Sequence, residues 1–289
     1  MKDFPIPVRP IGPGSQPLDE AGLDYVPIPR DVPTFSMPRI PDDADAANMR
    51  AARDLLARFV DGMAGGASKL DLAGFDAGGL EVLNQTLGEG EVAIRIADAA
   101  APNGGDTIDV RIQETVFAGV WRERHVDGDG RLAHDYLQAC GIPQIAIDAA
   151  RRAASPTLPA VDMPPGAMNA PALLAEIREQ VRRFRPHRAP HVINLTLLPL
   201  TPDDQRVLER AIAPGPVAIL SRGFGNCRVS STRLANLWRV QYFNSMQTLI
   251  LNTIEVVTVP EVALAAAEDL ADSRERLVEL LDWMNEATA

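Results

Sequence analysis

A cysteine between two arginines is the feature of this sequence best suited to chemistry. Cys227 lies in the run SRGFGNCR, with Arg222 before it and Arg228 directly after it. Because neighbouring cations favour the thiolate, the pKa of this thiol could be lowered. Gly223 and Gly225 allow the backbone to adopt φ > 0 and let another molecule approach closely. The run therefore predicts a turn that binds a partner or supports thiol chemistry.

Three interpretations of Cys227 remain open from its chemistry alone. A free cysteine is most often a small buried residue. A nucleophilic cysteine requires a histidine and an orienting carboxylate or amide, and spacing alone brings no histidine to it. A metal or cluster ligand requires companions, but Cys140 is the only other cysteine, and Pro190 disfavours a chelating helical turn from His187 to His191. We predict no catalytic residues, no metal site and no cofactor.

The segment that must position this turn is one of two related stretches. VRIQETVFAGVWR (Val110–Arg122) and CRVSSTRLANLWR (Cys227–Arg239) share a pattern, and two of the three tryptophans, Trp121 and Trp238, align in it. Such self-similarity indicates an internal duplication. Residues shared by both copies are candidates for scaffold, and chemistry found in the second copy alone is a candidate for function. The position of Cys227 is occupied by Val110 in the first copy, so the strand itself does not require a cysteine.

Each copy predicts the same short series of elements. A helix over residues 76–87 has a counterpart that begins at Thr201, which can cap it, with Pro202 in the first turn. A strand over residues 92–94 matches one over residues 217–219. A long strand, a third strand and a further helix follow in each copy. Short turns between neighbouring strands imply antiparallel pairing.

These elements predict an α+β fold in which two tandem repeats form a pseudo-symmetric two-layer sandwich, with the helices on one face of the sheet. The expected division is a proline-rich extended or disordered arm over residues 1–44, a first repeat with a leading helix over 45–154, a linker over 155–171 and a second repeat over 172–289. The first copy carries eight extra residues in a loop around residues 102–105.

The second copy adds aromatic and amide side chains after its tryptophan. Tyr242 and Asn244 follow the shared Trp-Arg pair, and aromatic residues near amides and arginines are typical of protein-recognition surfaces. Combined with the turn, they give a predicted partner-binding set: Arg222, Gly223, Phe224, Gly225, Asn226, Cys227, Arg228, Ser231, Tyr242 and Asn244.

Composition limits the class of partner and the compartment. A net charge of -11 disfavours nucleic acid, and the one basic run, Arg178–Arg188, is best interpreted as a solvated helix end. No stretch approaches the roughly 18 apolar residues of a membrane helix, and no signal sequence is recognisable. Two cysteines provide no disulfide framework, which is compatible with a reducing compartment. The sequence therefore predicts a cytoplasmic protein.

The second copy also carries a family resemblance. SRGFGNCRVSSTRLANLWRVQYFNS and the following LILNTIEVVTVPEVALAAAEDLADSRERL resemble the HupH/HyaF family of accessory proteins for uptake nickel-iron hydrogenase maturation. The first copy resembles the family more weakly, through LGEGEVAI and ETVFAGVWR. The family pattern covers the turn from Gly223 to Arg228 and continues through Ser231, Thr232 and Trp238 to Asn244. No catalytic residues come with it.

The resemblance implies a non-enzymatic assembly factor that acts on the iron-sulfur small subunit precursor before assembly and export. It implies the small subunit as partner, with other hydrogenase accessory proteins as further partners. Two alternatives stay open: a carrier of an iron-sulfur cluster or metal, and a thiol-dependent enzyme that uses Cys227.

Overall fold

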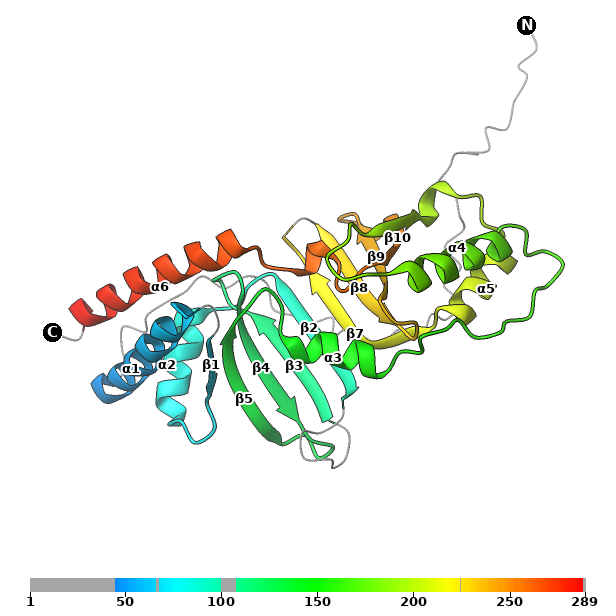
Figure 1. Ribbon diagram of the computed structural model, residues 1–289. Helices are drawn as coiled ribbons and strands as arrows, with labels where there is room; N and C mark the ends of the chain where they lie inside the picture. The colour runs from blue at the N-terminus through cyan, green and yellow to red at the C-terminus, as the bar shows by residue number, and fades with distance from the viewer. Residues whose placement is uncertain (1–44, 66–67, 100–107, 224, 288–289) are drawn as a thin grey trace, which may run out of the picture.

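A computed structural model describes residues 45–65, 68–99, 108–223 and 225–287 (Figure 1). The predicted arm over residues 1–44, the inserted loop around residues 102–105 and Phe224 lie outside the described residues.

The first half of the described chain contains three helices and five strands: α1 (Ala46–Met63), β1 (Ser68–Asp71), α2 (Ala77–Leu87), β2 (Val92–Ala99), β3 (Ile108–Glu114), β4 (Val120–Val126), β5 (Leu132–Ala139) and α3 (Gln144–Arg152). The second half contains the following: α4 (Ala170–Arg183), β6 (His191–Asn194), the 3-10 helix η1 (Leu195–Leu197), α5 (Pro202–Ala211), β7 (Pro214–Ser221), β8 (Asn226–Thr232), β9 (Leu237–Phe243), β10 (Leu249–Val256), the 3-10 helix η2 (Glu261–Ala263) and α6 (Ala267–Ala287).

All ten strands form one antiparallel sheet in the order β1-β5-β4-β3-β2-β7-β8-β9-β10-β6. The two halves meet where β2 pairs with β7, with Ile94 opposite Ile219 (Figure 1). The prediction of about three strands in each repeat is wrong, because each half contributes five. The strands that the sequence pattern missed include β1 and β6, which have four residues each and are too short for a periodic signal.

Helices cover both faces of the sheet, so the prediction of helices on one face is also wrong. The short helix α3 packs over the central strands through Ala146, Ala149 and Ala150, together with Ala263 of η2. The remaining helices lie on the opposite face, with α1, α2 and α6 over the first half and α4 and α5 over the second. Since successive strand residues point to opposite faces, Trp121 faces α3 while its neighbour Val120 faces α1 and α2.

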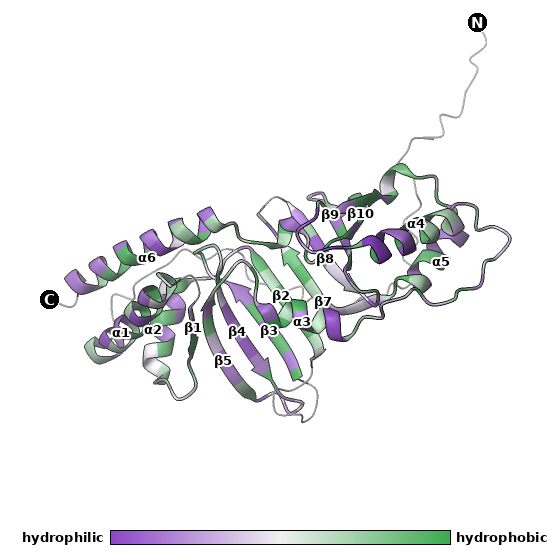
Figure 2. Ribbon diagram, viewed as in Figure 1, coloured by the Kyte–Doolittle hydropathy of each residue, from purple (hydrophilic) through white to green (hydrophobic). Residues whose placement is uncertain are grey.

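The α3 face holds the central core. Trp121 and Trp238 are both buried there, and their indole N–H groups donate to the carbonyls of Cys140 (2.9 Å) and Thr258 (3.0 Å) respectively. This confirms the interpretation of the shared tryptophans as scaffold. Figure 2 shows the central strands β2 and β7 largely hydrophobic, whereas β4 and β5 are largely hydrophilic.

The predicted helix starts are confirmed by their capping contacts. Asp76 caps α2 by accepting from the backbone N–H groups of Gly78 and Gly79. In α5, the hydroxyl of Thr201 accepts from the N–H of Asp204, whose carboxylate accepts from the N–H of Thr201 in return. Each arrangement satisfies N–H groups that the first helical turn leaves without partners.

Candidate functional site

The predicted turn joins β7 to β8 and lies at the same end of the strands as the turn between β9 and β10. Register places Ser221 opposite Cys227, and Asn226 opposite Phe243 at the end of β9. The N–H of Arg222 donates to the carbonyl of Glu91 at 3.1 Å, which ties the turn to the start of β2. The structure therefore brings together most of the predicted partner-binding residues at one end of the strands.

Two different structural constraints favour glycine at positions 223 and 225 of the turn. Gly225 has φ +95°, a conformation that disfavours residues with a side chain. A Cβ atom at Gly223 would overlap the carboxylate of Glu91. The close approach that the sequence predicted at Gly223 is therefore made within the chain.

Cys227 points into the core, and the prediction of a lowered pKa is wrong. Its side chain is 1% exposed and packs in the cluster beneath α3. The pKa of the thiol is raised to about 11, chiefly by burial, with the hydrogen bond to Tyr242 opposing the increase and the charge of Glu255 adding to it. Arg228 does not activate it, because adjacent strand residues point to opposite faces. The guanidinium of Arg228 instead lies over the ring of Phe243, 5.3 Å from its centroid.

Ser231 and Asn244 have structural roles that differ in exposure. Ser231 is buried, and its hydroxyl accepts from the N–H of Val217 at 3.0 Å, so this side chain is part of the scaffold. Asn244 shapes the β9–β10 turn, because its side-chain oxygen accepts from the N–H groups of Met246 and Thr248, both at 2.9 Å. Like Cys227, Ser231 does not reach the surface, whereas Arg228 and Tyr242 are half-buried on their strands and remain partly accessible together with the two turns.

Exposed apolar side chains surround the β9–β10 turn, and sequence reasoning missed them. We call Leu197, Met246, Leu249 and Ile250 the apolar rim; Met246 is 79% exposed, Leu197 74% and Ile250 55%. The hydroxyl of Thr196 accepts from the N–H of Asn252 at 2.7 Å, which holds η1 beside β10. Neighbouring exposed apolar residues of this kind are typical of interaction surfaces. The sequence feature that could have predicted this surface is the run of three apolar residues, Leu249 to Leu251, directly after a turn.

A buried polar cluster in the first half was also missed. Glu123 is 1% exposed; it binds His125 Nε2 at 2.7 Å and Lys69 Nζ at 3.1 Å, and Gln138 donates to its other oxygen. The hydrogen bond from His125 and the positive charge of Lys69 outweigh burial and hold the pKa of Glu123 below its ordinary value. The matching positions of the second half hold other residue types, with Val240 at the place of Glu123.

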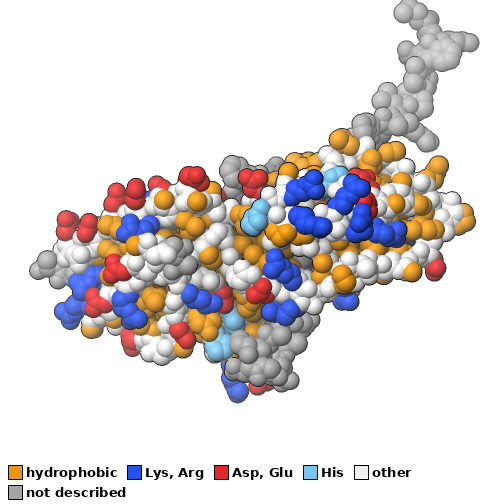
Figure 3. All heavy atoms as spheres, viewed as in Figure 1, with side chains coloured by type: hydrophobic (Ala, Val, Ile, Leu, Met, Phe, Trp, Pro, Cys, Tyr) orange, Lys and Arg blue, Asp and Glu red, His pale blue; other side chains and the backbone are white. Residues whose placement is uncertain are grey.

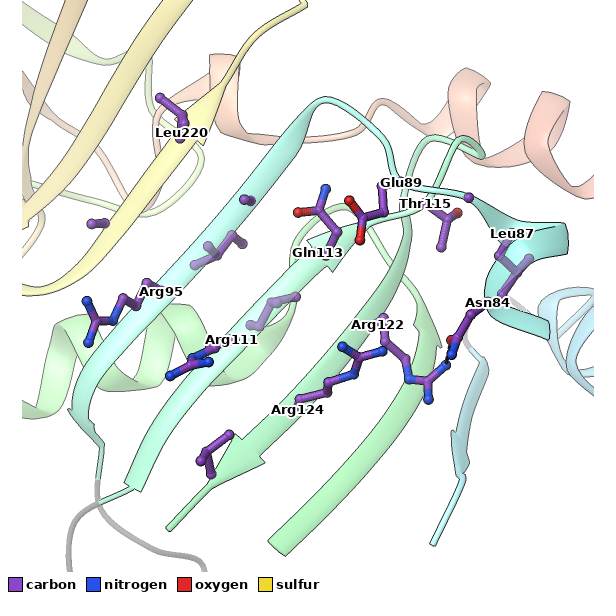
Figure 4. A pocket seen from close by; sticks show the side chains of 16 residues that line it. Asn84, Leu87, Glu89, Arg95, Arg111, Gln113, Thr115, Arg122, Arg124 and Leu220 are labelled. Carbon is purple, nitrogen blue, oxygen red and sulfur yellow. Dashed lines mark hydrogen bonds between the residues drawn. The ribbon is translucent and has the colours of Figure 1, made fainter. Parts of the chain in front are cut away.

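The sheet face opposite α3 contains a cavity of about 410 Å³ between the helices of the two halves. Its floor is formed by β7, β2, β3 and β4, and the end of α2 forms one wall (Figure 4). Arg95, Arg111, Arg122 and Arg124 line it together with Gln113.

The described residues contain no group of three or more His, Cys, Asp or Glu side chains that could hold a metal ion. Among the same residues, no helix combines the length and hydropathy needed to cross a membrane.

The sequence pattern described as the C-terminal conserved region of HupH hydrogenase expression protein matches residues 54–155 and 167–284. The chain belongs to this family. Among HupH-family relatives, it is 42% identical to the hydrogenase expression/formation protein HoxQ of Cupriavidus necator, over 98% of this chain and 99% of that one. It is 39% identical to HupH of Rhodobacter capsulatus, over 98% of each chain. It is 33% identical to the hydrogenase-1 operon protein HyaF of Escherichia coli, over 96% of each.

A solved structure from the HupH family is also similar to part of the chain. The hydrogenase expression protein HupH from Thiobacillus denitrificans is 29% identical, with a TM-score of 0.37, and the match covers 39% of this chain and 95% of that one.

Proposed function

We propose that this protein is a cytoplasmic accessory factor that holds the iron-sulfur small subunit precursor of a nickel-iron hydrogenase before assembly and export. Membership of a family of hydrogenase expression proteins, with relatives named for hydrogenase expression and formation, is the observation that carries the proposal. The proposed role is non-enzymatic binding of a folding or assembly intermediate.

The client-binding surface that we propose lies at one end of the strands and is formed by the β7–β8 turn, the β9–β10 turn and the apolar rim. An unassembled subunit exposes apolar surface that its final partner later covers, and an exposed apolar rim is suited to shield such surface. Asn226 lies opposite Phe243, next to the β9–β10 turn, and would supply a polar contact at the border of the rim. The proposal transfers the emphasis from the buried Cys227 to Met246 and Ile250.

We propose that the halves arose by duplication and that only the second was adapted for client binding. Strands β3, β4 and β5 have counterparts in β8, β9 and β10, and the starts of β4 and β5 are each 117 residues before their counterparts. The turn that precedes β8 is short, whereas the loop at the matching place in the first half is longer. The domain division predicted from the sequence is part of this proposal.

The alternatives have less support. A thiol-dependent enzyme would need an accessible thiolate, but Cys227 is buried and its pKa is raised to about 11. A cluster or metal carrier has no group of three candidate ligands among the described residues, and its ligands would have to come partly from the client.

The test is co-purification from cells that express the small subunit precursor. The tagged wild-type protein should capture the precursor, and a double variant, Met246→Asp with Ile250→Asp, should capture at least about tenfold less. Leu132→Asp is the matched control, because Leu132 is also 55% exposed but lies on β5 in the first half. A variant without residues 1–41 tests the contribution of the arm, and we expect weaker capture.

The two possible failures separate the identity of the client from the surface that binds it. Failure of the wild-type protein to capture the precursor would refute the small subunit as client. Equal capture by the wild-type protein and the double variant would refute the apolar rim as the binding surface, while leaving the client intact.

A further inference from the structure

The cavity on the open sheet face is cationic although the chain is acidic. Four arginines and one carboxylate, that of Glu89, are the charged residues that line it (Figure 4). The chain as a whole has 28 Lys and Arg residues against 39 Asp and Glu residues. A separate concentration of cations lies over α4 at the surface (Figure 3), where Arg182 and Arg183 are paired with Glu179. The arginines of the cavity are instead fixed on strands.

Three of these arginines form a ladder across neighbouring strands. Arg95 on β2 lies directly opposite Arg111 on β3, and Arg111 lies directly opposite Arg124 on β4. Like charges that face each other across strands destabilise a sheet, so this arrangement has a cost for folding. An arrangement with such a cost suggests a role outside folding, and a bound anion would remove the repulsion.

The carboxylates nearby compensate the ladder only in part. Asp109 binds Arg95 at 3.1 Å and Arg111 at 3.0 Å, so one carboxylate serves two guanidinium groups. Asp135 accepts two hydrogen bonds from Arg122. Within the part of the chain that the structure describes, Arg124 has no ion pair.

The position of Arg124 supports anion binding. It is exposed to solvent in the cavity. Its pKa is lowered, first by partial removal from water and then by the positive charge of Arg122, while Asp135 and Glu89 act in the opposite direction. The guanidinium group presents a fork of N–H donors that matches the two oxygens of a carboxylate.

Apolar side chains flank the arginine ladder. Ala93 and Leu220 line the cavity next to the ladder, and Val126 lines its far end on β4. In an extended peptide with acidic residues at alternate positions, the carboxylates all point to one side of the chain, where they can meet the arginine ladder, and the intervening apolar side chains point away from it. A volume of about 410 Å³ is large enough for several side chains.

The second half lacks this arrangement. The positions that match Arg95 and Arg124 hold Leu220 and Gln241, while Arg111 is matched by Arg228. The shared scaffold thus does not require an arginine at either end of the ladder. Gln241 also shows that glutamine is accepted at the position equivalent to Arg124.

We propose that this cavity binds an acidic, extended peptide segment of a partner protein through Arg95, Arg111 and Arg124. The proposal is independent of the apolar rim, because the cavity lies on β2, β3, β4 and β7 and its test requires no hydrogenase subunit. The carboxylates of the segment would lie over the ladder, on one side of the extended chain.

The test is fluorescence anisotropy with a labelled peptide of sequence DLELDL and a label-matched peptide KLKLKL. The full-length protein should bind the acidic peptide and not the basic one, and added salt should weaken binding. Arg124→Gln should weaken binding by about tenfold, and Arg124→Lys less, because lysine keeps the charge but loses the fork. Arg178→Gln, on exposed α4, is the control for loss of one positive charge elsewhere.

Each result supports or overturns the proposal. Circular dichroism and thermal unfolding should show that Arg124→Gln is folded, as expected from Gln241 at the matching position. No binding of the acidic peptide to the wild-type protein would overturn the proposal, as would an equal loss in Arg178→Gln. Binding of citrate in isothermal titration calorimetry, without binding of the peptide, would also overturn it, because the site would then take a small organic acid.

Discussion

A buried carboxyl group at Glu114 should make the stability of this protein depend on pH. Glu114 is 8% exposed, and its carboxylate accepts from the N–H of Gly119 at 2.9 Å. Its pKa is raised from 4.5 to about 7, chiefly by burial and also by the negative charges of Glu91 and Asp269, while the hydrogen bond from Gly119 opposes the increase. The folded protein therefore holds this proton in a pH range where the unfolded chain has released it.

The sign and size of the effect follow from proton linkage. Below about pH 4.5 both states are protonated and Glu114 contributes no pH dependence. As the pH rises toward 7, the unfolded state loses the proton first, so the free energy of unfolding falls. At about 1.4 kcal/mol per pKa unit, the total loss above pH 7 is about 3 kcal/mol. Between about pH 5.5 and pH 8 the loss amounts to roughly 2 kcal/mol.

Glu114→Gln removes this dependence while keeping an oxygen that can accept from Gly119. Denaturant unfolding of the wild type and the variant at about pH 5.5 and pH 8 should show the variant gaining about 2 kcal/mol relative to the wild type at the higher pH. Glu275→Gln, on the exposed surface of α6, is the control for loss of a carboxylate. A difference between Glu114→Gln and wild type that stays constant with pH would refute the reasoning.

Two further predictions concern buried groups. Arg122→Ala leaves the buried carboxylate of Asp135 without its guanidinium partner, so the free energy of unfolding should fall by about 3–5 kcal/mol in denaturant titrations. Arg182→Ala, which breaks an exposed pair, should change it little, and equal losses would contradict the burial argument. Because the pKa of Cys227 is raised to about 11, roughly 0.1% of the thiol is ionised at pH 8, and iodoacetamide should label native Cys227 at least about 100-fold more slowly than the unfolded chain by mass spectrometry. Rapid labelling of the native protein would contradict the buried position.

Local signals were readable from the sequence because they depend on residues close together in the chain. Thr201 and Asp204 form the cap of α5 through atoms three residues apart. The shared tryptophans indicated scaffold because a large side chain retained at the same place in two copies is most simply explained by packing. Both are buried.

The features that the sequence did not predict correctly depend on contacts between residues that are distant in the chain. Whether Cys227 faces the core or the solvent is set by the register of β8 with β7 and β9, and a shift of one residue would reverse it. The cavity exists because β2 pairs with β7 and the helices of each half stay near their own end of the sheet. Neither the pairing of β2 with β7 nor the placement of the helices can be inferred from the spacing of apolar residues.

Each half carries surface chemistry that the other half lacks. The second half alone has the short turn before β8 and the apolar rim, which are suited to apolar client surface. The first half alone has the complete arginine ladder, since Leu220 and Gln241 replace its two outer members in the second. Because β2 and β7 are paired at the centre, the two surfaces belong to one continuous sheet. A partner that carries an acidic segment beside an apolar patch could therefore contact both surfaces at once, and its affinity would exceed that of either contact alone.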